Sequence, residues 1–230
     1  MATADGTNEE SRLRAGMRIQ NMHTALFAAA ASAVMVTAAA SASNSQSTVQ
    51  VLRFDDVATT TSWTYGTYTG DLGTYGGFSW GSCGVVRQTS GMSGYVTGLV
   101  SGNQTMFTSP SGTSSVSAAY PWSFVGAYMT GAWNTNMTVT LTGLLAGATV
   151  HSMTFTLGDP TGPTWVNANF TNIDTLRIQA SGGTAYWPDG AATHLAIDDF
   201  TALVPAPGAV SLLLVAGAGR RNRRRNDGNG

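Results

Sequence analysis

Two pairs of adjacent aspartates could bind calcium, one pair near each end of the central region. They lie in "FDD" and "IDDF", within the first and last strands that the sequence predicts: Asp55, Asp56, Asp198 and Asp199. Terminal strands are often neighbours in jelly rolls, and a structural calcium ion would relieve the repulsion among four carboxylates. In the alternative interpretation, one aspartate of each pair faces solvent and the other caps a turn or accepts backbone hydrogen bonds.

Aromatic residues in two Gly-rich stretches could bind a carbohydrate. The stretches, 63–75 and 182–190, are both interpreted as loops, and their candidate ligand-binding residues are Trp63, Tyr65, Tyr68, Tyr75, Tyr186, Trp187 and Asp189. Aromatic rings cover the apolar C–H faces of sugars, while amide and carboxylate groups bind the hydroxyls. The alternative is that these rings are buried against the edges of the domain, as we expect for Trp80, Trp122 and Trp133.

Catalytic patterns are weaker than these binding patterns. "GFSWG" at 77–81 matches the G-x-S-x-G nucleophile elbow, but the β-like "GSCGVVRQ" that follows Ser79 is not the helix that an elbow requires. Glycoside hydrolysis needs two carboxylates held across a sugar, and no aspartate pair is marked for that role. A secreted glycan hydrolase that uses an aspartate pair is therefore the alternative, and we expect no catalytic residues.

The elements that must position these residues are short β-like runs separated by Gly, Ser, Asn and Pro. Strands are predicted at 48–56, 76–80, 84–88, 104–108, 113–119, 122–130, 136–142, 148–157, 164–170, 173–179 and 194–203. In "NMTVTLT", Met137, Val139 and Leu141 alternate with threonines, which indicates one buried face. The pattern predicts an all-β fold, a single two-sheet β-sandwich that is jelly-roll-like.

Charge and cysteine content limit the classes of partner. Between residues 43 and 204 there are eight aspartates and three arginines, and the chain has no lysine. Such an acidic domain is a poor partner for nucleic acid, which binds basic surfaces. Cys83 is the only cysteine, so no intrachain disulfide can form. We therefore expect no nucleic-acid partner.

The N-terminal segment, 1–42, is typical of a secretory signal peptide. An Ala-rich apolar run at 24–40 follows three arginines, and Ala40-Ser41-Ala42 forms an A-x-A-like cleavage site. Translation could also begin at Met17 or Met22, which would give a basic region of more ordinary length. The alternative is a retained membrane anchor. The predicted domain then occupies 43–203.

The C-terminal segment, 204–225, contains three successive features before a polar tail at 226–230. A Pro-x-Pro element comes first, an apolar run of 11 residues follows at 209–219, and an arginine cluster ends the segment. The apolar run is shorter than the roughly 20 residues that span a bilayer, and the arginines would stay on the cytoplasmic side. The residues concerned are Pro205, Ala206, Pro207, Arg220, Arg221, Arg223, Arg224 and Arg225.

This tripartite segment resembles the PEP-CTERM sorting signal of Gram-negative bacteria. The outer prolines correspond to Pro205 and Pro207, and Ala206 stands where that family usually has glutamate. The resemblance implies an exosortase, a membrane transpeptidase, as partner during export, with the C-terminal helix held transiently in the inner membrane. Segments such as "YGGFSW" and "HLAIDDF" also loosely resemble a β-sandwich architecture found among PEP-CTERM proteins, to which no activity is attached.

These patterns together predict an exported protein of the cell envelope, outer surface or extracellular matrix. The expected role is non-catalytic: an adhesive, structural or polysaccharide-associated module. Its expected partners are the secretion machinery, an exosortase and an extracellular polysaccharide. A plain tail anchor is the alternative to sorting, although such an anchor would need no Pro-x-Pro element.

Overall fold

The computed structural model describes residues 47–110, 112–188 and 192–206, which all fall in one compact unit. The predicted signal peptide, 1–42, lies outside the described residues, as do the arginine cluster and the sorting segment from Pro207 onward. The predictions for those segments stay predictions. In the described stretches no helix has the length and apolar character needed to cross a bilayer.

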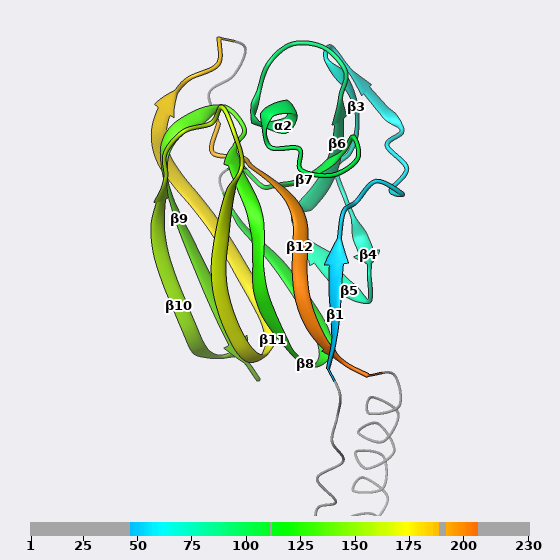
Figure 1. Cartoon of the computed structure of the whole chain (residues 1–230), viewed down its shortest axis with the longest axis vertical. Coiled ribbons are helices and arrows are strands. Elements are labelled where there is room, and N and C mark those ends of the chain that lie inside the picture. The colour runs from blue at the N-terminus through cyan, green and yellow to red at the C-terminus, as the bar shows by residue number, and fades with distance from the viewer. Residues whose placement is uncertain (1–46, 111, 189–191, 207–230) are drawn as a thin grey trace, which may run out of the picture. The chain divides into compact units, whose positions relative to one another are not determined.

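The described residues are almost entirely β (Figure 1). They form the strands β1 (Ser47–Leu52), β2 (Thr61–Trp63), β3 (Gly66–Thr69), β4 (Gly73–Tyr75), β5 (Phe78–Gly81), β6 (Cys83–Gln88), β7 (Thr105–Thr108), β8 (Thr113–Gly131), β9 (Asn134–Leu145), β10 (Ala148–Leu157), β11 (Thr164–Ala185) and β12 (Leu195–Pro205), with one short helix, α2 (Gly94–Thr97). The predicted all-β class is confirmed.

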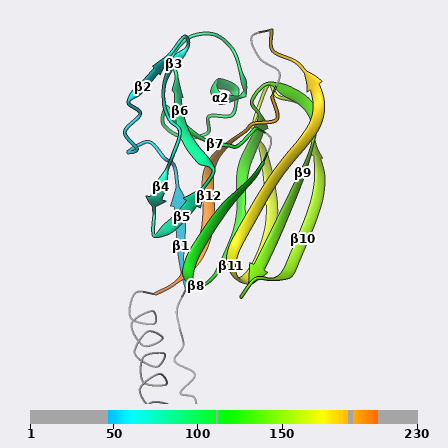
Figure 2. The same cartoon turned by 180° about the vertical axis from the view of Figure 1, so that it is seen from behind.

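The strands of the described residues form one continuous antiparallel sheet that folds into a sandwich (Figures 1 and 2). Its hydrogen-bonded order is β10-β9-β11-β8-β12-β7-β6-β3-β2, with β1 paired to β12, β5 to β8 and β4 to β5. The first and last strands, β1 and β12, are neighbours, as the sequence predicted. The ends of the described chain therefore lie side by side.

Two long strands bend to close this sandwich. The sequence predicted a break within each of them, at 120–121 and at 171–172, but β8 and β11 run through both positions. Pairing between β11 and β8 shifts register three times between Asn167 and Thr175, and Asn169 and Asn172 have positive φ. Bulges bend a strand without ending it. The predicted breaks were therefore bends.

The hairpin β9–β10 follows its sequence pattern closely. Met137, Val139 and Leu141 are fully buried and the intervening Thr138 is exposed, so the predicted inward face is confirmed. The two strands are joined by Ala146 and Gly147, which both have positive φ. That backbone is typical of the two-residue turns that suit the twist of antiparallel strands.

The main core fills the interior of the sandwich. Phe200 lies near its centre, with its ring 4.7 Å from the ring of Phe124 and 5.2 Å from that of Trp80, measured between centroids. These side chains are buried, as are the aliphatic residues around them, which come from β1, β5, β8, β9, β11 and β12. Trp80 and Trp122 are both buried as predicted.

Candidate functional site

A second apolar cluster lies on the opposite face of three strands that also line the main core. Along β6, Val85 belongs to the main core and Val86 to the second cluster. On β7, Met106 belongs to the main core and Phe107 packs against the second cluster. On β12, Ile197 belongs to the main core and Ala196 to the second cluster. Successive side chains of a strand point to opposite faces, so this part of the sheet is apolar on both sides.

The second cluster surrounds a pocket of about 340 Å³, hereafter the aromatic pocket. Its lining residues are Trp63, Tyr68, Val86, Tyr95, Phe107, Trp133 and His194. The elements that carry them gather at the upper end of the domain in Figures 1 and 2. Five aromatic rings and one imidazole therefore face a single hollow on the outer side of the sheet.

The hairpin β2–β3 contributes one wall of the aromatic pocket. Trp63 pairs with Gly66 in this hairpin, and Tyr68 pairs with Val86 across β3 and β6. A Cβ atom on Gly66 would clash with the backbone carbonyl of Arg87. Glycine at this position therefore allows β3 to approach β6 closely enough to bring both rings over the sheet.

The short helix α2 contributes Tyr95. Ser93 caps it, since its Oγ accepts a hydrogen bond from the Tyr95 amide at 3.1 Å. The Gly94 amide donates to the Ala132 carbonyl at 2.8 Å, and a side chain on Gly94 would clash with the Gly131 carbonyl. This close approach of helix and β8 places the buried Tyr95 ring beside Trp133.

The rings meet edge to face. The centroid of Trp133 lies 5.7 Å from that of Tyr95 and 6.5 Å from that of Trp63, with interplanar angles of 87° and 86°. Edge-to-face pairs are a favourable arrangement of aromatic rings. Burial raises the pKa of Tyr95, and a hydrogen bond with the Trp133 side chain opposes that rise. Tyr95 is therefore a neutral phenol at physiological pH.

His194 supplies an imidazole to the aromatic pocket in a defined tautomer. Its Nδ1 lies 2.6 Å from the backbone carbonyl oxygen of Thr108, which can only accept, so Nδ1 carries the hydrogen. Burial lowers the pKa of His194 more than this hydrogen bond raises it. The ring is therefore neutral near pH 7, and its Nε2 is a hydrogen-bond acceptor.

The loop prediction for the first aromatic stretch was wrong, since Trp63, Tyr68 and Tyr75 lie in β2, β3 and β4. These strands are only three or four residues long and rich in Gly and Thr, so they lack the apolar alternation that identifies strands. Trp63 and Tyr68 nevertheless line the aromatic pocket. Tyr65 lies in the turn between them, edge-on to Trp63 at 5.2 Å.

The remaining predicted ligand-binding residues divide between two places. Trp187 packs against the second cluster, and Tyr186, 47% exposed, contacts its ring edge-on at 4.8 Å. Tyr75 lies elsewhere and packs against Phe54 of the main core. Burial, together with a 2.6 Å hydrogen bond to Asp56, raises the pKa of Tyr75 to about 12. Asp189 lies outside the described residues.

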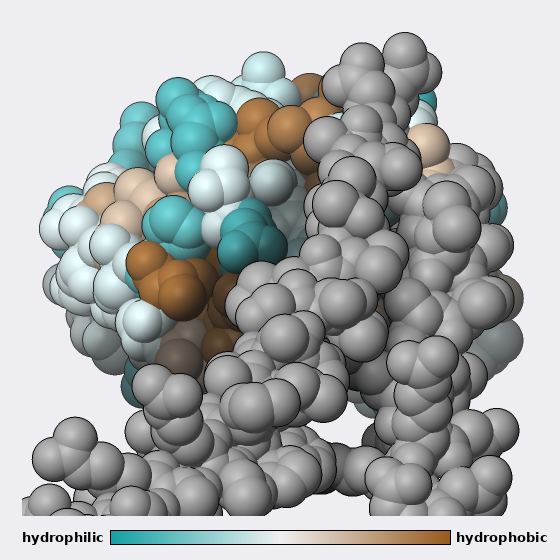
Figure 3. All heavy atoms as spheres, turned by 90° about the horizontal axis from the view of Figure 1, so that it is seen from below, coloured by the Kyte–Doolittle hydropathy of each residue, from teal (hydrophilic) through white to brown (hydrophobic). Residues whose placement is uncertain are grey.

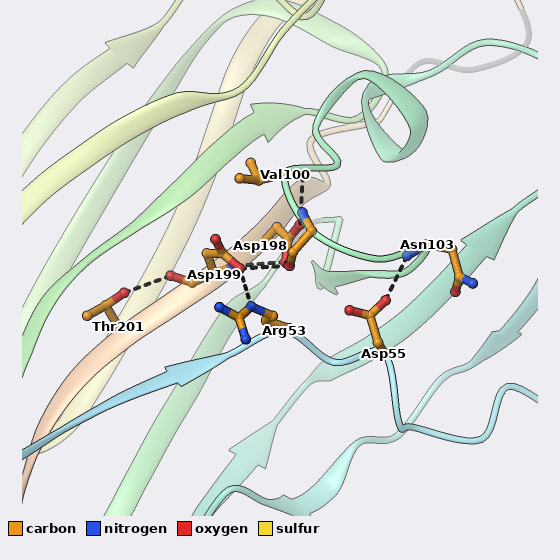
Figure 4. Close-up of polar contacts among 8 residues, drawn as sticks. Arg53, Asp55, Val100, Asn103, Asp198, Asp199 and Thr201 are labelled. Carbon is orange, nitrogen blue, oxygen red and sulfur yellow. Dashed lines mark hydrogen bonds and ion pairs between the residues drawn. The ribbon is translucent and has the colours of Figure 1, made fainter.

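The four aspartates proposed for calcium have protein partners, and Figure 4 shows three of them, Asp55, Asp198 and Asp199. Asp55 accepts a hydrogen bond from the Asn103 amide at 2.7 Å, and Asp56 accepts the one from Tyr75. Asp199 forms an ion pair with Arg53, at 3.5 Å. No three His, Cys, Asp or Glu side chains within the described stretches are grouped so as to hold a metal ion. Calcium binding stays a prediction.

Asp198 is the fully buried member of this set. Its Oδ2 accepts hydrogen bonds from the amides of Val100 and Ser101, both at 2.8 Å, and its Oδ1 accepts one from the Asp199 amide at 2.7 Å. Burial raises the pKa of Asp198, and these three N–H donors oppose that rise. Through these hydrogen bonds, the Asp198 carboxylate on β12 holds Val100 and Ser101, which follow α2, against the strand.

Five residues of the aromatic pocket were not predicted as site residues: Val86, Tyr95, Phe107, Trp133 and His194. The sequence does hold a signal for the strands beneath the pocket, because "VV" in β6, "MF" in β7 and "LAI" in β12 are consecutive apolar residues. A strand with one solvated face alternates instead, so such runs indicate burial on both faces. Trp133 was predicted to be buried, and it is 7% exposed.

Comparison with known proteins gives only distant structural likenesses. No protein-family model matches the sequence, and no curated protein matches it. A DUF4465 family protein from Bacteroides caccae superimposes with a TM-score of 0.45 and 12% identity, over 69% of this chain and 100% of that one. The structure of TmCBM61 in complex with β-1,4-galactotriose gives a TM-score of 0.33 and 12% identity, over 58% and 90%. Neither likeness is close enough to transfer a function.

Proposed function

We propose that this protein is an exported, non-catalytic surface module that binds polysaccharide in the aromatic pocket. The observation that carries the proposal is the gathering of five aromatic rings and one neutral imidazole around a pocket of about 340 Å³. That volume lies within the range of small-molecule sites. Aromatic faces bind the C–H surfaces of sugar rings, and a few polar atoms bind the hydroxyls.

The pocket is too large to be a packing defect between buried rings. Close-packed protein interiors contain few voids larger than a water molecule, whose share of liquid volume is about 30 Å³. The hollow between the rings is about 340 Å³. Trp63 and Tyr68, which line it, are only half-buried. These features favour a binding site over the alternative that the rings merely bury one another.

The same lining favours binding over hydrolysis. A glycosidase needs two carboxylates across the scissile bond, about 5 to 10 Å apart. None of the described residues that line the aromatic pocket is Asp or Glu. The buried Asp198 is engaged by backbone amides at the base of the loop after α2. A non-catalytic module is therefore the better-supported proposal.

The position of the chain ends supports attachment at the opposite end of the domain. Ser47 pairs with Pro205, so the start of β1 lies beside the end of β12. Both strand ends lie at the lower end in Figure 1, whereas the elements of the aromatic pocket lie at the upper end. Apolar and hydrophilic patches share that lower face, seen from below in Figure 3. A sorting segment or tether that follows Pro205 would leave the aromatic pocket directed away from the attachment point.

Binding by the full chain to neutral oligosaccharides tests the proposed function. We suggest oligomers of β-1,4-linked glucose, xylose, mannose and galactose, with isothermal titration calorimetry as the readout. Trp63→Ala should weaken binding at least about fivefold, because the stacking of a sugar on a tryptophan contributes at least about 1 kcal/mol and the ring forms a wall of the pocket. Trp165→Ala is the matched control, since Trp165 is 39% exposed on β11 and contacts Tyr128 instead.

Either of two results would remove the binding proposal. One is the absence of binding to any of these oligomers, and the other is equal loss of binding in the two tryptophan variants. The expected result for Trp63→Ala is an unchanged melting temperature and an affinity lowered at least about fivefold. An affinity that this substitution does not change would place the sugar site elsewhere on the molecule.

Export through an exosortase route is tested separately, in the native host. We propose that the mature protein begins near residue 43 and ends near Pro207, because those positions close the predicted signal peptide and the Pro-x-Pro element. Intact-mass analysis of cell-bound and shed fractions would show both cleavages. A mass that retains Arg225 would instead identify the terminal segment as an ordinary anchor.

A further inference from the structure

We infer that the aromatic pocket selects an uncharged sugar unit, one of whose hydroxyl groups donates a hydrogen bond to Nε2 of His194. This inference rests on the proposed function and names the class of ligand. It follows from the tautomer of His194 and from the absence of charge on the described side chains that line the pocket.

The tautomer of His194 decides whether its free ring nitrogen donates a hydrogen bond to a ligand or accepts one. His194 is the one basic side chain among the described residues that line the pocket. Because Nδ1–H is used by the Thr108 carbonyl, only Nε2 remains for a ligand. The neighbouring Leu195 amide donates to Thr108 Oγ1 at 3.0 Å, which holds the same backbone segment in place. A ligand must therefore present a donor, and sugar hydroxyls are donors.

The described residues around His194 offer no charge to bind an acidic sugar. Its ring lies 5.8 Å from Phe107 on β7 and 6.5 Å from Tyr95 on α2, and both contacts are with neutral rings. Among the described residues that line the pocket, Tyr68 and Tyr95 are the only other titratable side chains. A carboxylate that enters such a site loses its hydration without an opposite charge in return, which is costly.

The pH dependence of the affinity then distinguishes a neutral ligand from an acidic one. A neutral sugar that fills the pocket excludes water from His194 and favours its uncharged form, so this binding must weaken as pH falls. An acidic sugar would favour the protonated imidazole, and its binding must strengthen instead. The sign of the pH dependence therefore reports the charge of the preferred ligand.

The experiment compares the neutral β-1,4-linked oligomers above with oligogalacturonate, an acidic counterpart, on the full chain. Titrations at about pH 7.5 and about pH 5.0 reach well below the ordinary pKa of histidine, because burial lowers the pKa of His194. We expect neutral oligomers to bind more weakly at the lower pH and oligogalacturonate to bind more weakly than they do at either pH. The variant His194→Asn retains a donor near the position of Nδ1 but has no Nε2.

His194→Asn should lower the affinity for the neutral oligomer about threefold to tenfold, as expected for one lost hydrogen bond. It should also remove the pH dependence while the melting temperature stays close to that of the wild type. If a neutral oligomer binds through Trp63 but His194→Asn changes neither affinity nor pH dependence, this inference fails and the proposed function stands. Tighter binding of oligogalacturonate than of the neutral oligomers would also overturn this inference and leave the proposed function standing. If no oligomer binds, both fail together.

Discussion

The two faces of the sheet formed by β12, β7 and β6 differ in how completely they are packed. On the inner face, Val85, Met106 and Ile197 are fully buried within the main core. On the outer face, Phe107 is only partly buried and lines a hollow of about 340 Å³. The same strands therefore support a closed core on one side and an open aromatic pocket on the other.

The difference arises from what covers each face. Long strands of the sandwich cover the inner face, and their alternating side chains interdigitate. The outer face is covered by short pieces: the hairpin β2–β3, the single turn α2 and the segment that contains Trp187. Short elements with few contacts cannot fill a space as regular strands do, so a binding hollow remains between them. Substitutions on the two faces should accordingly separate stability from binding.

The largest effect is expected in the inner core. Phe200→Ala removes a fully buried ring that contacts Phe78, Trp80, Trp122 and Phe124. We expect the free energy of unfolding to fall by about 3 to 5 kcal/mol, measured by urea denaturation. Val51→Ala, at a 38% exposed position on the edge strand β1, serves as the control and should cost less than about 1 kcal/mol. Equal effects would contradict the assignment of the core.

A smaller effect is expected where the outer cover is fastened to the sheet. Asp198→Asn replaces one acceptor oxygen by a donor opposite the amides of Val100 and Ser101. Because hydrogen bonds to charged groups are the stronger ones, we expect a loss of about 2 to 3 kcal/mol in thermal or urea unfolding. The exposed Asp71→Asn, whose carboxylate accepts only from the Gly73 amide at 3.0 Å, should change stability little.

The packing of α2 against β8 is expected to tolerate no added side chain. Gly94→Ala places a methyl group against the Gly131 carbonyl, so the helix must shift. We expect a loss of about 1 to 2 kcal/mol and a larger relative loss of oligosaccharide affinity, because Tyr95 moves with the helix. In contrast, Gly162→Ala meets open space, and a stability at or slightly above that of the wild type is expected. Unchanged binding in Gly94→Ala would show that α2 does not shape the pocket.

The smallest effect concerns protonation of His194. Its pKa is lowered in the folded state, so between that value and about 6.5 the unfolded chain binds more protons than the folded one. The stabilisation is present above pH 6.5 and is lost as pH falls through this window. The melting temperature should therefore drop from about pH 7.5 to about pH 5.5, and the drop should be smaller in His194→Asn. An identical drop would mean that other groups cause it.

Regular strands were predictable from the sequence alone. The alternation of Met137, Val139 and Leu141 with threonines predicted β9 and its buried face. The short strands β2, β3 and β4 escaped prediction, because three or four residues rich in Gly and Thr hold too few apolar positions to show a period. Local pattern therefore predicts long elements better than short ones.

By itself, the sequence determined the all-β class, the inward face of the long strands and the aromatic residue types available to a binding site, since these depend on composition and on local periodicity. Tertiary structure alone decided which rings meet. Trp63, Tyr95, Phe107 and Trp133 are far apart along the chain and converge only because β6, β7 and β12 are apolar on both faces. The tertiary structure also places Tyr75 against the main core, away from those rings, and fixes the tautomer of His194 through the Thr108 carbonyl. Such long-range contacts depend on how the sheet folds and not on the spacing of residues along the chain.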